Sequence, residues 1–335
     1  MATVFKNLLS SDVATTRTLL NEAIPITGTI VSGTYNDLNV RNYAHGMFQS
    51  VYDYPILSSS ANHIFDLTYG YSAVLDNPLN SMNSKKRNIY NQMAQVLVGY
   101  DDTGSIRSFD QDGNLTGGSK IDACVFISYA RLLAKDEVKK GSYTLTLAND
   151  AAPGAIVIGD YGAQNSYYVN SPAGEYGILY TSSVGPFLTS SGVGLIYYQA
   201  GVVVLTASTD IIESASFFTG SVTTTVGLDA WNISGTCDYM RHIWSDDLFN
   251  NTTELNSTIY FCRVNNSEFN YSSNQTYLSE SRIRVKENID DNPVSYITTV
   301  GLYSADNELL AVAKVSEPLK KDPTNELTLR VRLDY

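Results

Sequence analysis

Three histidines are the first candidates for chemistry in this chain: His45, His63 and His242. Histidine titrates near neutral pH, so each could serve as a general acid or base beside a nucleophile and an orienting carboxylate. Aromatic or aliphatic residues flank all three, which favours packed or surface side chains. Chain order alone leaves a Ser-His-Asp triad open, but no Gly-x-Ser-x-Gly motif marks a nucleophile.

Oxygen-bearing side chains near residue 110 could bind a metal ion instead. Asp110, Asp112 and Asn114 have the chemistry of calcium ligands. Gly113, however, comes too early for an EF-hand loop, and a Gly-Asn turn already accounts for these residues. We therefore favour a turn over a metal site.

Other acidic and glycine-rich segments give no stronger signal. Asp246-Asp247 and Asp290-Asp291 are adjacent pairs, and neighbours on a strand point to opposite faces, so neither predicts a two-carboxylate site. Gly192-Val-Gly194 lacks the lysine and hydroxyl of a P-loop. We expect no catalytic residue, no cofactor, no metal and no enzyme activity.

The elements that would position these side chains are mostly predicted strands. One clear helix covers 84–98, and a second is predicted at 12–22, where Asp12 could be the N-cap. Turn residues then separate strand candidates in a way that favours a sandwich or barrel. These candidates are 123–132, 142–147, 155–158, 167–169, 177–180, 194–198 and 202–206.

The last segment predicts a small C-terminal sheet. Strands are expected at 282–286, 297–303, 309–315 and 327–333, with a hairpin turn at Asp306-Asn307. In the last strand, leucine and valine alternate with charged residues, so one face should be buried and the other charged. We predict that the charged face, with Arg282, Arg284, Arg330 and Arg332, binds an acidic partner subunit.

A second interface is predicted near the N-terminus. The segment Ile24–Tyr35 is apolar and β-branched, and we interpret it as a strand or extended arm. An apolar edge strand tends to pair with another chain. The residues expected to contact another subunit are Ile24, Ile26, Ile30 and Val31.

Together these patterns predict a mainly β protein with a few helices (α+β). The expected organisation is an N-terminal helical and extended arm region at 1–100, a sandwich or barrel-like central β-domain at 101–230, and a polar loop region with a small C-terminal β-sheet domain at 231–335. A length of 335 residues suits such a division.

Charge and hydropathy narrow the class of partner. A net charge of −12 argues against nucleic acid, because phosphate binding needs a basic face. We expect no membrane association, since no apolar stretch is long enough to span a bilayer and no signal peptide pattern opens the chain. The long stretch between Lys140 and Arg241 holds no basic residue, which favours packing against other subunits.

The C-terminal sequence resembles a known class of protein. Ile297–Lys314, Glu317–Lys321 and Leu327–Leu333 are similar to a segment of tail and tail-fibre-attachment proteins in contractile-tailed phages, where a hairpin with the pattern Gly-Leu-Tyr then Glu-Leu-Leu-Ala-Val-Ala-Lys precedes a proline and a closing strand. Two further stretches resemble virion structural proteins of T4-like phages. They are 93–99 continuing into 110–118 and 126–141, and 170–179 continuing into 194–205.

The resemblance implies a virion structural protein of the tail or baseplate, an adaptor between neighbouring tail subunits that is assembled in the bacterial cytoplasm. Its partners would be other virion proteins, with homo-oligomers also expected. Alternatives are a neck, collar or capsid-surface protein, a carbohydrate-binding receptor module in the aromatic segment 41–71, and a tailspike enzyme. A tailspike would normally show β-helix repeats and clustered acids, and neither is found.

Overall fold

The computed structural model describes residues 5–78, 80–115, 117–147, 155–181, 191–207, 231–272, 290 and 292–335, together with the backbone of 278–279 and 282–283. In these residues the chain is mainly β, with short helices between antiparallel strands, which confirms the expected fold class. The chain divides into two compact units. We call Leu20–Thr253 the core unit, and Met1–Leu19 with Glu254–Tyr335 the terminal unit. This division differs from the three consecutive regions expected, because the two ends of the chain share one unit.

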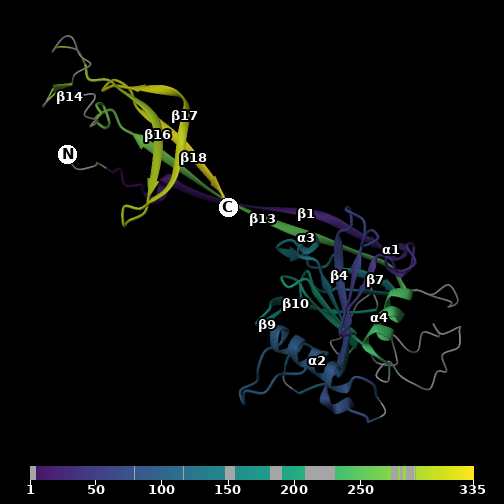
Figure 1. Ribbon diagram of the computed structural model, residues 1–335. Helices are drawn as coiled ribbons and strands as arrows, with labels where there is room; N and C mark the ends of the chain where they lie inside the picture. Colours follow the sequence, from purple (N-terminus) through teal and green to yellow (C-terminus); the bar gives the residue numbers. More distant parts are fainter. Residues whose placement is uncertain are drawn as a thin grey trace. The chain divides into compact units, whose positions relative to one another are not determined.

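Strands far outweigh helices along the described chain (Figure 1). The helices are η1 (Ser10–Asp12), α1 (Gly28–Ser32), η2 (Ala73–Leu75), α2 (Asn83–Leu97), α3 (Arg131–Ala134) and α4 (Ile233–His242). The strands are β1 (Val13–Thr27), β2 (Val40–Asn42), β3 (Gln49–Tyr52), β4 (His63–Tyr71), β5 (Ala123–Tyr129), β6 (Glu137–Val138), β7 (Thr144–Leu147), β8 (Ile156–Gly159), β9 (Tyr168–Ser171), β10 (Gly174–Leu179), β11 (Gly194–Tyr197), β12 (Val202–Thr206), β13 (Trp244–Val264), β14 (Leu278–Ser279), β15 (Arg282–Ile283), β16 (Ser295–Tyr303), β17 (Leu309–Lys321) and β18 (Leu327–Asp334).

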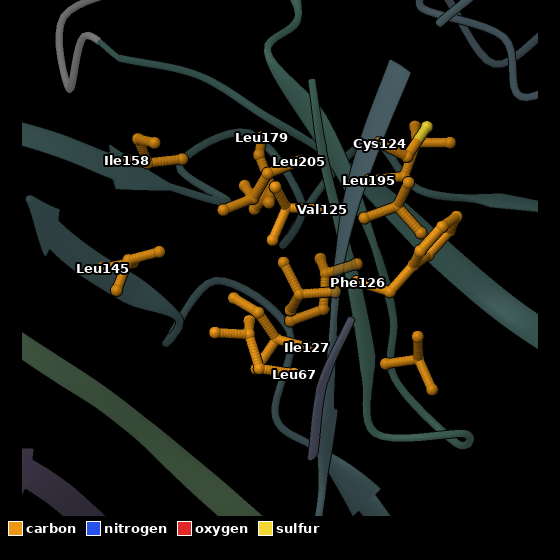
Figure 2. Packing of buried hydrophobic residues seen from close by; sticks show 14 of the residues in the cluster. Leu67, Cys124, Val125, Phe126, Ile127, Leu145, Ile158, Leu179, Leu195 and Leu205 are labelled. Carbon is orange, nitrogen blue, oxygen red and sulfur yellow. The ribbon is translucent and has the colours of Figure 1, made fainter. Parts of the chain in front are cut away.

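Two packed sheets build the core unit. The larger has eight antiparallel strands in the order β2-β3-β4-β5-β12-β11-β10-β9. In the other sheet, β13 lies between β1 and β7, and β8 follows β7. Leu145 and Ile158 of this sheet meet Val125 and Leu205 of the larger one in a single buried cluster (Figure 2). The result is the sandwich expected for the central region.

Helix α2 packs against β4, where a glycine permits close approach. A Cβ atom on Gly70 would lie 2.7 Å from the carbonyl oxygen of Lys86 and 2.8 Å from the backbone nitrogen of Tyr90. The helix confirms the prediction at 84–98. Its buried Tyr90 donates a hydrogen bond to the carbonyl oxygen of Ile121 at 2.9 Å, which ties the helix to the segment before β5.

The predicted helix at 12–22 is wrong, because this segment is the first part of β1. Val13 and the threonines at 15, 16 and 18 are β-branched and favour a strand. β1 pairs with β13, so a long-range partner supplies the backbone hydrogen bonds that a helix would have made locally. The expected extended segment 24–35 is likewise only strand to Thr27, after which α1 and a turn follow.

The terminal unit holds two two-stranded sheets, β14-β15 and β16-β17, and one end of the β13 sheet, instead of the single four-stranded sheet expected at the C-terminus. β16 pairs with β17 around the predicted turn, where Asn307 has a φ of 64°. β18 pairs with Ser257–Val264 at the end of β13. The sequence pattern missed this pairing because β13 runs for 21 residues through a segment expected to be mostly polar loop.

Candidate interaction surface

The predicted N-terminal contact residues lie in the core unit and are largely covered by their own chain. Ile26 and Val31 are 3% and 0% exposed and belong to the hydrophobic cluster. Ile24 and Ile30 are half-buried and pack against that cluster. Ile26 and Val31 therefore serve folding, and they present no free surface to another subunit.

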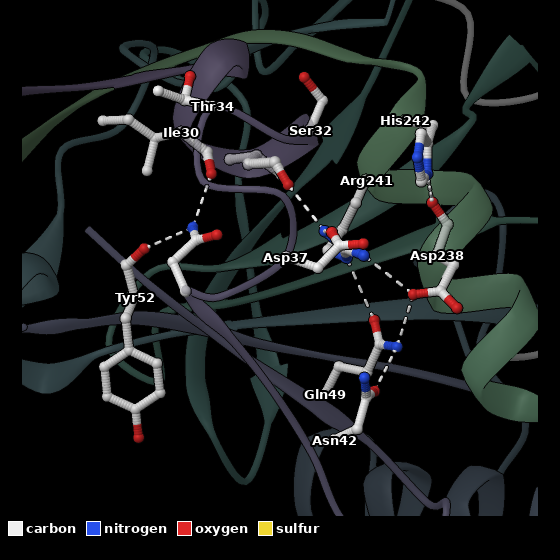
Figure 3. A network of polar contacts seen from close by, with 12 residues as sticks. Ile30, Ser32, Thr34, Asp37, Asn42, Gln49, Tyr52, Asp238, Arg241 and His242 are labelled. Carbon is white, nitrogen blue, oxygen red and sulfur yellow. Dashed lines mark hydrogen bonds and ion pairs between the residues drawn. The ribbon is translucent and has the colours of Figure 1, made fainter. Parts of the chain in front are cut away.

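A buried arginine fixes the same segment to α4. Arg241 is 1% exposed, and its guanidinium lies 2.9 Å from carboxylate oxygens of both Asp37 and Asp238 (Figure 3). It also donates hydrogen bonds to the carbonyl oxygen of Val31 at 3.1 Å and to the side-chain oxygen of Gln49 at 3.3 Å. A buried cation needs such partners because burial removes its hydration. The network thus holds β3, α4 and the segment after α1 together.

His63 has both an aspartate and a serine nearby, but the three side chains do not form a catalytic triad. His63 lies 2.9 Å from Asp66 Oδ1, and Ser50 donates a hydrogen bond to the same oxygen. The hydrogen bond with Asp66 raises the pKa of His63. Burial alone would raise the pKa of Asp66, but the hydrogen bonds from His63 and Ser50 lower it overall. A nucleophilic serine would have to donate to the histidine, whereas here both side chains contact the carboxylate.

The other two histidines are exposed on the surface of the core unit. His45 stacks on Tyr43 with ring centroids 5.2 Å apart. His242 places its Nδ1 2.6 Å from the carbonyl oxygen of Asp238. Both arrangements fit the packed or surface roles expected from their sequence neighbours.

The strongest perturbation of an acid lies at Asp247. Its side chain is fully buried, and Tyr129 donates a hydrogen bond to Oδ2 at 2.5 Å, while Tyr129 and Tyr143 share a further bond of 3.0 Å. Burial raises the pKa of Asp247 to about 8, against a smaller lowering by the Tyr129 hydrogen bond. Its neighbour Asp246 is exposed, so the pair points to opposite faces, as expected.

The acidic loop near residue 110 is closed by its own contacts. Asp112 accepts hydrogen bonds from the backbone nitrogen of Asn114 at 3.1 Å and from its side-chain nitrogen at 2.6 Å. Lys120 lies 2.9 Å from Asp110. These contacts fit the turn favoured from the sequence. In the part of the chain that the structure describes, no three His, Cys, Asp or Glu side chains group as metal ligands.

Three of the seven tyrosine and phenylalanine residues of segment 41–71 are buried and unavailable as a carbohydrate platform. Phe65, Tyr69 and Tyr71 are at most 1% exposed and lie within the core cluster. Tyr54 is 49% exposed, with the ring of Tyr35 6.0 Å away. The aromatic residues at 43, 48 and 52 are half-buried, so this segment divides its aromatic side chains between the core and the surface.

The predicted basic face lies on the terminal unit. Arg330 and Arg332 are exposed, while Leu329, Val331 and Leu333 point to the more buried side of β18, which confirms the alternation expected for this strand. Arg332 lies 2.6 Å from Asp334. For Arg282 the structure describes only the backbone, on β15, and Arg284 lies outside the described residues.

Behind the apolar side of β18 lies an open cavity that the sequence did not predict. Its volume is about 680 Å³, and its walls include Leu302 of β16 with Leu329 and Leu333 of β18. Four large lining residues remain exposed: Phe5 at 43%, Phe269 at 40%, Tyr303 at 46% and Leu310 at 68%. The signal available in the sequence was the alternation of β16 and β18, but which strands would face each other could not be deduced from it.

Comparison of the chain with protein-family models, with curated proteins and with solved structures gives no match in any of the three. Among the described residues, none of the helices is both long and apolar enough to cross a membrane.

Proposed function

We propose that this chain is a structural subunit of a contractile-tailed phage particle, in the tail or baseplate, where it joins neighbouring subunits. The observation that carries the proposal is the terminal unit, in which β18 exposes Arg330 and Arg332 on one side and half-covered leucines on the other. A surface of this kind suits docking, because charge steers encounter and apolar side chains supply affinity. The resemblance of 297–333 to tail and tail-fibre-attachment proteins supports the location.

No catalytic step is part of the proposed role. Ser50 and His63 both contact Asp66. The serine therefore does not donate its hydrogen bond to the histidine, as a nucleophilic serine would. The buried acid Asp247 contacts Tyr129 inside the sandwich and lies away from solvent. A net charge of −12 further supports protein partners over nucleic acid.

The test is incorporation into particles. Arg330→Glu with Arg332→Glu reverses the charge of the exposed face, and we expect the chain's copy number in purified particles to fall at least tenfold. Folding should change little, because exposed ion pairs such as Arg332–Asp334 contribute only about 0–1 kcal/mol. Quantitative mass spectrometry of purified particles measures the copy number.

A matched control reverses two exposed arginines of the core unit, Arg41→Glu with Arg131→Glu. The net charge changes by the same amount, so a general charge effect would affect both variants alike. Normal incorporation of the Arg330/Arg332 variant would contradict the docking role of this face. A labelled chain that electron microscopy places on the capsid or neck would contradict the tail or baseplate location.

A further inference from the structure

The described part of the terminal unit buries few apolar side chains. Val264 and Val331 are the only hydrophobic residues counted as buried in its described part, and the large core cluster lies within the core unit. Burial of apolar side chains is the main term that offsets the conformational entropy lost when the backbone is ordered. The described apolar side chains of this unit are therefore only partly covered by its other described residues.

Several of these partly covered side chains line the cavity. Leu302, Leu329 and Leu333 line it from two sheets but are only half-buried, because the space of about 680 Å³ between them is open. Phe5 packs edge-on against Tyr303 with ring centroids 5.0 Å apart, yet both rings stay more than 40% exposed. Exposed large apolar side chains gathered around an open space, here with polar residues such as Lys6 and Asn307 also in its wall, mark a contact site for a protein or a ligand.

Charge indicates which partner fits. The terminal unit carries 11 of the chain's 22 Lys and Arg residues and 13 of its 34 Asp and Glu residues, so its net charge is −2 and that of the core unit is −10. Like charge therefore opposes contact between two core units but scarcely opposes contact between two terminal units. β17 also exposes both signs, with Lys314 and Lys320 near Glu317, as a self-complementary twofold contact requires.

We propose that a second copy of this chain closes the cavity, so that two terminal units pack together through its exposed apolar side chains. Each copy would place Leu310 and the neighbouring rings against the cavity of the other. The exposed apolar side chains of both copies would then be buried in one contact. The second copy is one partner in the assembly role proposed above. The dimer is argued from the cavity and the charges, and only its use in a particle rests on the proposed function. The contact differs from the arginine face of β18, which stays free for an unlike neighbour.

The mass of the full chain tests the proposal by analytical ultracentrifugation across a concentration series. We expect the wild type to pass from monomer to dimer, and Leu310→Glu to weaken the dimer at least tenfold. Leu132→Glu is the matched control, since Leu132 is 80% exposed but lies on α3 of the core unit. Phe5→Glu provides a second lining variant outside any strand or helix, and so keeps the test valid if Leu310→Glu misfolds.

A built-in thiol reports on the same contact. Cys262 lines the cavity and is half-buried, whereas Cys124 and Cys237 are buried. Alkylation of Cys262 by iodoacetamide should slow as the wild-type concentration rises, and should be concentration-independent in Leu310→Glu. A wild type that is monomeric throughout with a freely reactive Cys262 would overturn the proposal in favour of an unlike partner. Concentration-independent protection with a co-purified small molecule in native mass spectra would overturn it in favour of a ligand.

These results are separable from the location proposed for the chain. A monomeric wild type that still enters particles normally would sink self-association and leave the virion role standing. A chain that forms the dimer in solution but is absent from purified particles would support self-association and contradict the virion role.

Discussion

Asp247 is a buried acid whose neutral form is favoured by the fold. Tyr129 donates to one of its oxygens, and the other has no hydrogen-bond partner among the described residues. Its pKa is raised to about 8 from the ordinary value of 3.8 because burial disfavours the charged form. The folded chain therefore binds a proton more tightly than the unfolded chain at this position. Its contribution to stability is complete below about pH 4 and is lost as the pH rises towards 8.

We expect Asp247→Asn to remove this loss, because asparagine cannot ionise. The difference between the unfolding midpoint of the variant and that of the wild type should increase from pH 5 to pH 8, in favour of the variant. Above pH 8 this difference should stay constant. Thermal unfolding followed by circular dichroism at each pH measures it. Asp246→Asn is the control, since Asp246 is the exposed neighbour. Parallel curves for wild type and Asp247→Asn would show that the buried acid does not control the pH dependence.

Arg241 is a buried cation whose removal should destabilise the core unit. Arg241→Met leaves Gln49 and the carbonyl oxygen of Val31 without this donor, and two carboxylates without their counterion. The two carboxylates are about half exposed and can be hydrated, so the main loss is that of the buried hydrogen bonds, about 1–3 kcal/mol. For a unit of this size we expect the midpoint of thermal unfolding to fall by roughly 2–12 °C. Arg131→Met, at an exposed arginine, should shift it by no more than about 2 °C.

At the scale of elements, the β4–α2 contact depends on Gly70. A Cβ atom there would meet backbone atoms at 2.7 and 2.8 Å, and backbone cannot move aside as a flexible side chain can. We expect Gly70→Ala to destabilise the chain by about 1–3 kcal/mol, as overpacking does. Urea unfolding followed by fluorescence measures the difference.

A second substitution tests the cause of that loss. Ile89 also approaches this position, with its Cγ2 atom 3.2 Å from the added Cβ. Shortening it in Gly70→Ala/Ile89→Ala should not restore stability, because the backbone clash remains. Recovery in the double variant would show instead that side-chain crowding, and not backbone approach, limits this contact.

Local patterns predicted the elements that make their contacts nearby. The helix at 84–98, the turn at Asp306-Asn307 and the alternation of the last strand follow from periodicity and turn chemistry alone. The helix predicted at 12–22 failed because β1 pairs with β13 more than 200 residues later. No local signal encodes that pairing, and tertiary contacts override the weak helical preference.

The same limit applies to the candidate interaction surface. The exposure of Arg330 and Arg332 could be predicted, since strand alternation fixes the face of each residue. The burial of Ile26 and Val31 could not, because an apolar segment looks the same at an interface and in a core. The cavity was missed because its walls come from β16, β18 and the N-terminal segment, which only the fold brings together.

At the scale of the whole molecule, the two units differ in how their apolar residues are covered. The hydrophobic cluster extends from Ile26 to Phe249 within the core unit, while leucines of the terminal unit remain half-buried or exposed. Local opening free energies follow the density of buried contacts, so the terminal unit should open at lower free energy. The unfolding of the chain is therefore not expected to be a single two-state process.

The three cysteines allow this difference to be measured without altering the chain. Cys262 lies in the terminal unit, whereas Cys124 and Cys237 are fully buried in the core unit. In a urea series with a short pulse of thiol reagent, we expect Cys262 to be labelled completely at a lower urea concentration than the other two. Peptide mass spectrometry assigns each label. Raising the protein concentration should move the Cys262 transition to higher urea, because dimerisation stabilises only the folded terminal unit, and should leave the Cys124 and Cys237 transition in place. Simultaneous labelling of all three thiols would mean that the units unfold together, and that the terminal unit draws its stability from within the chain.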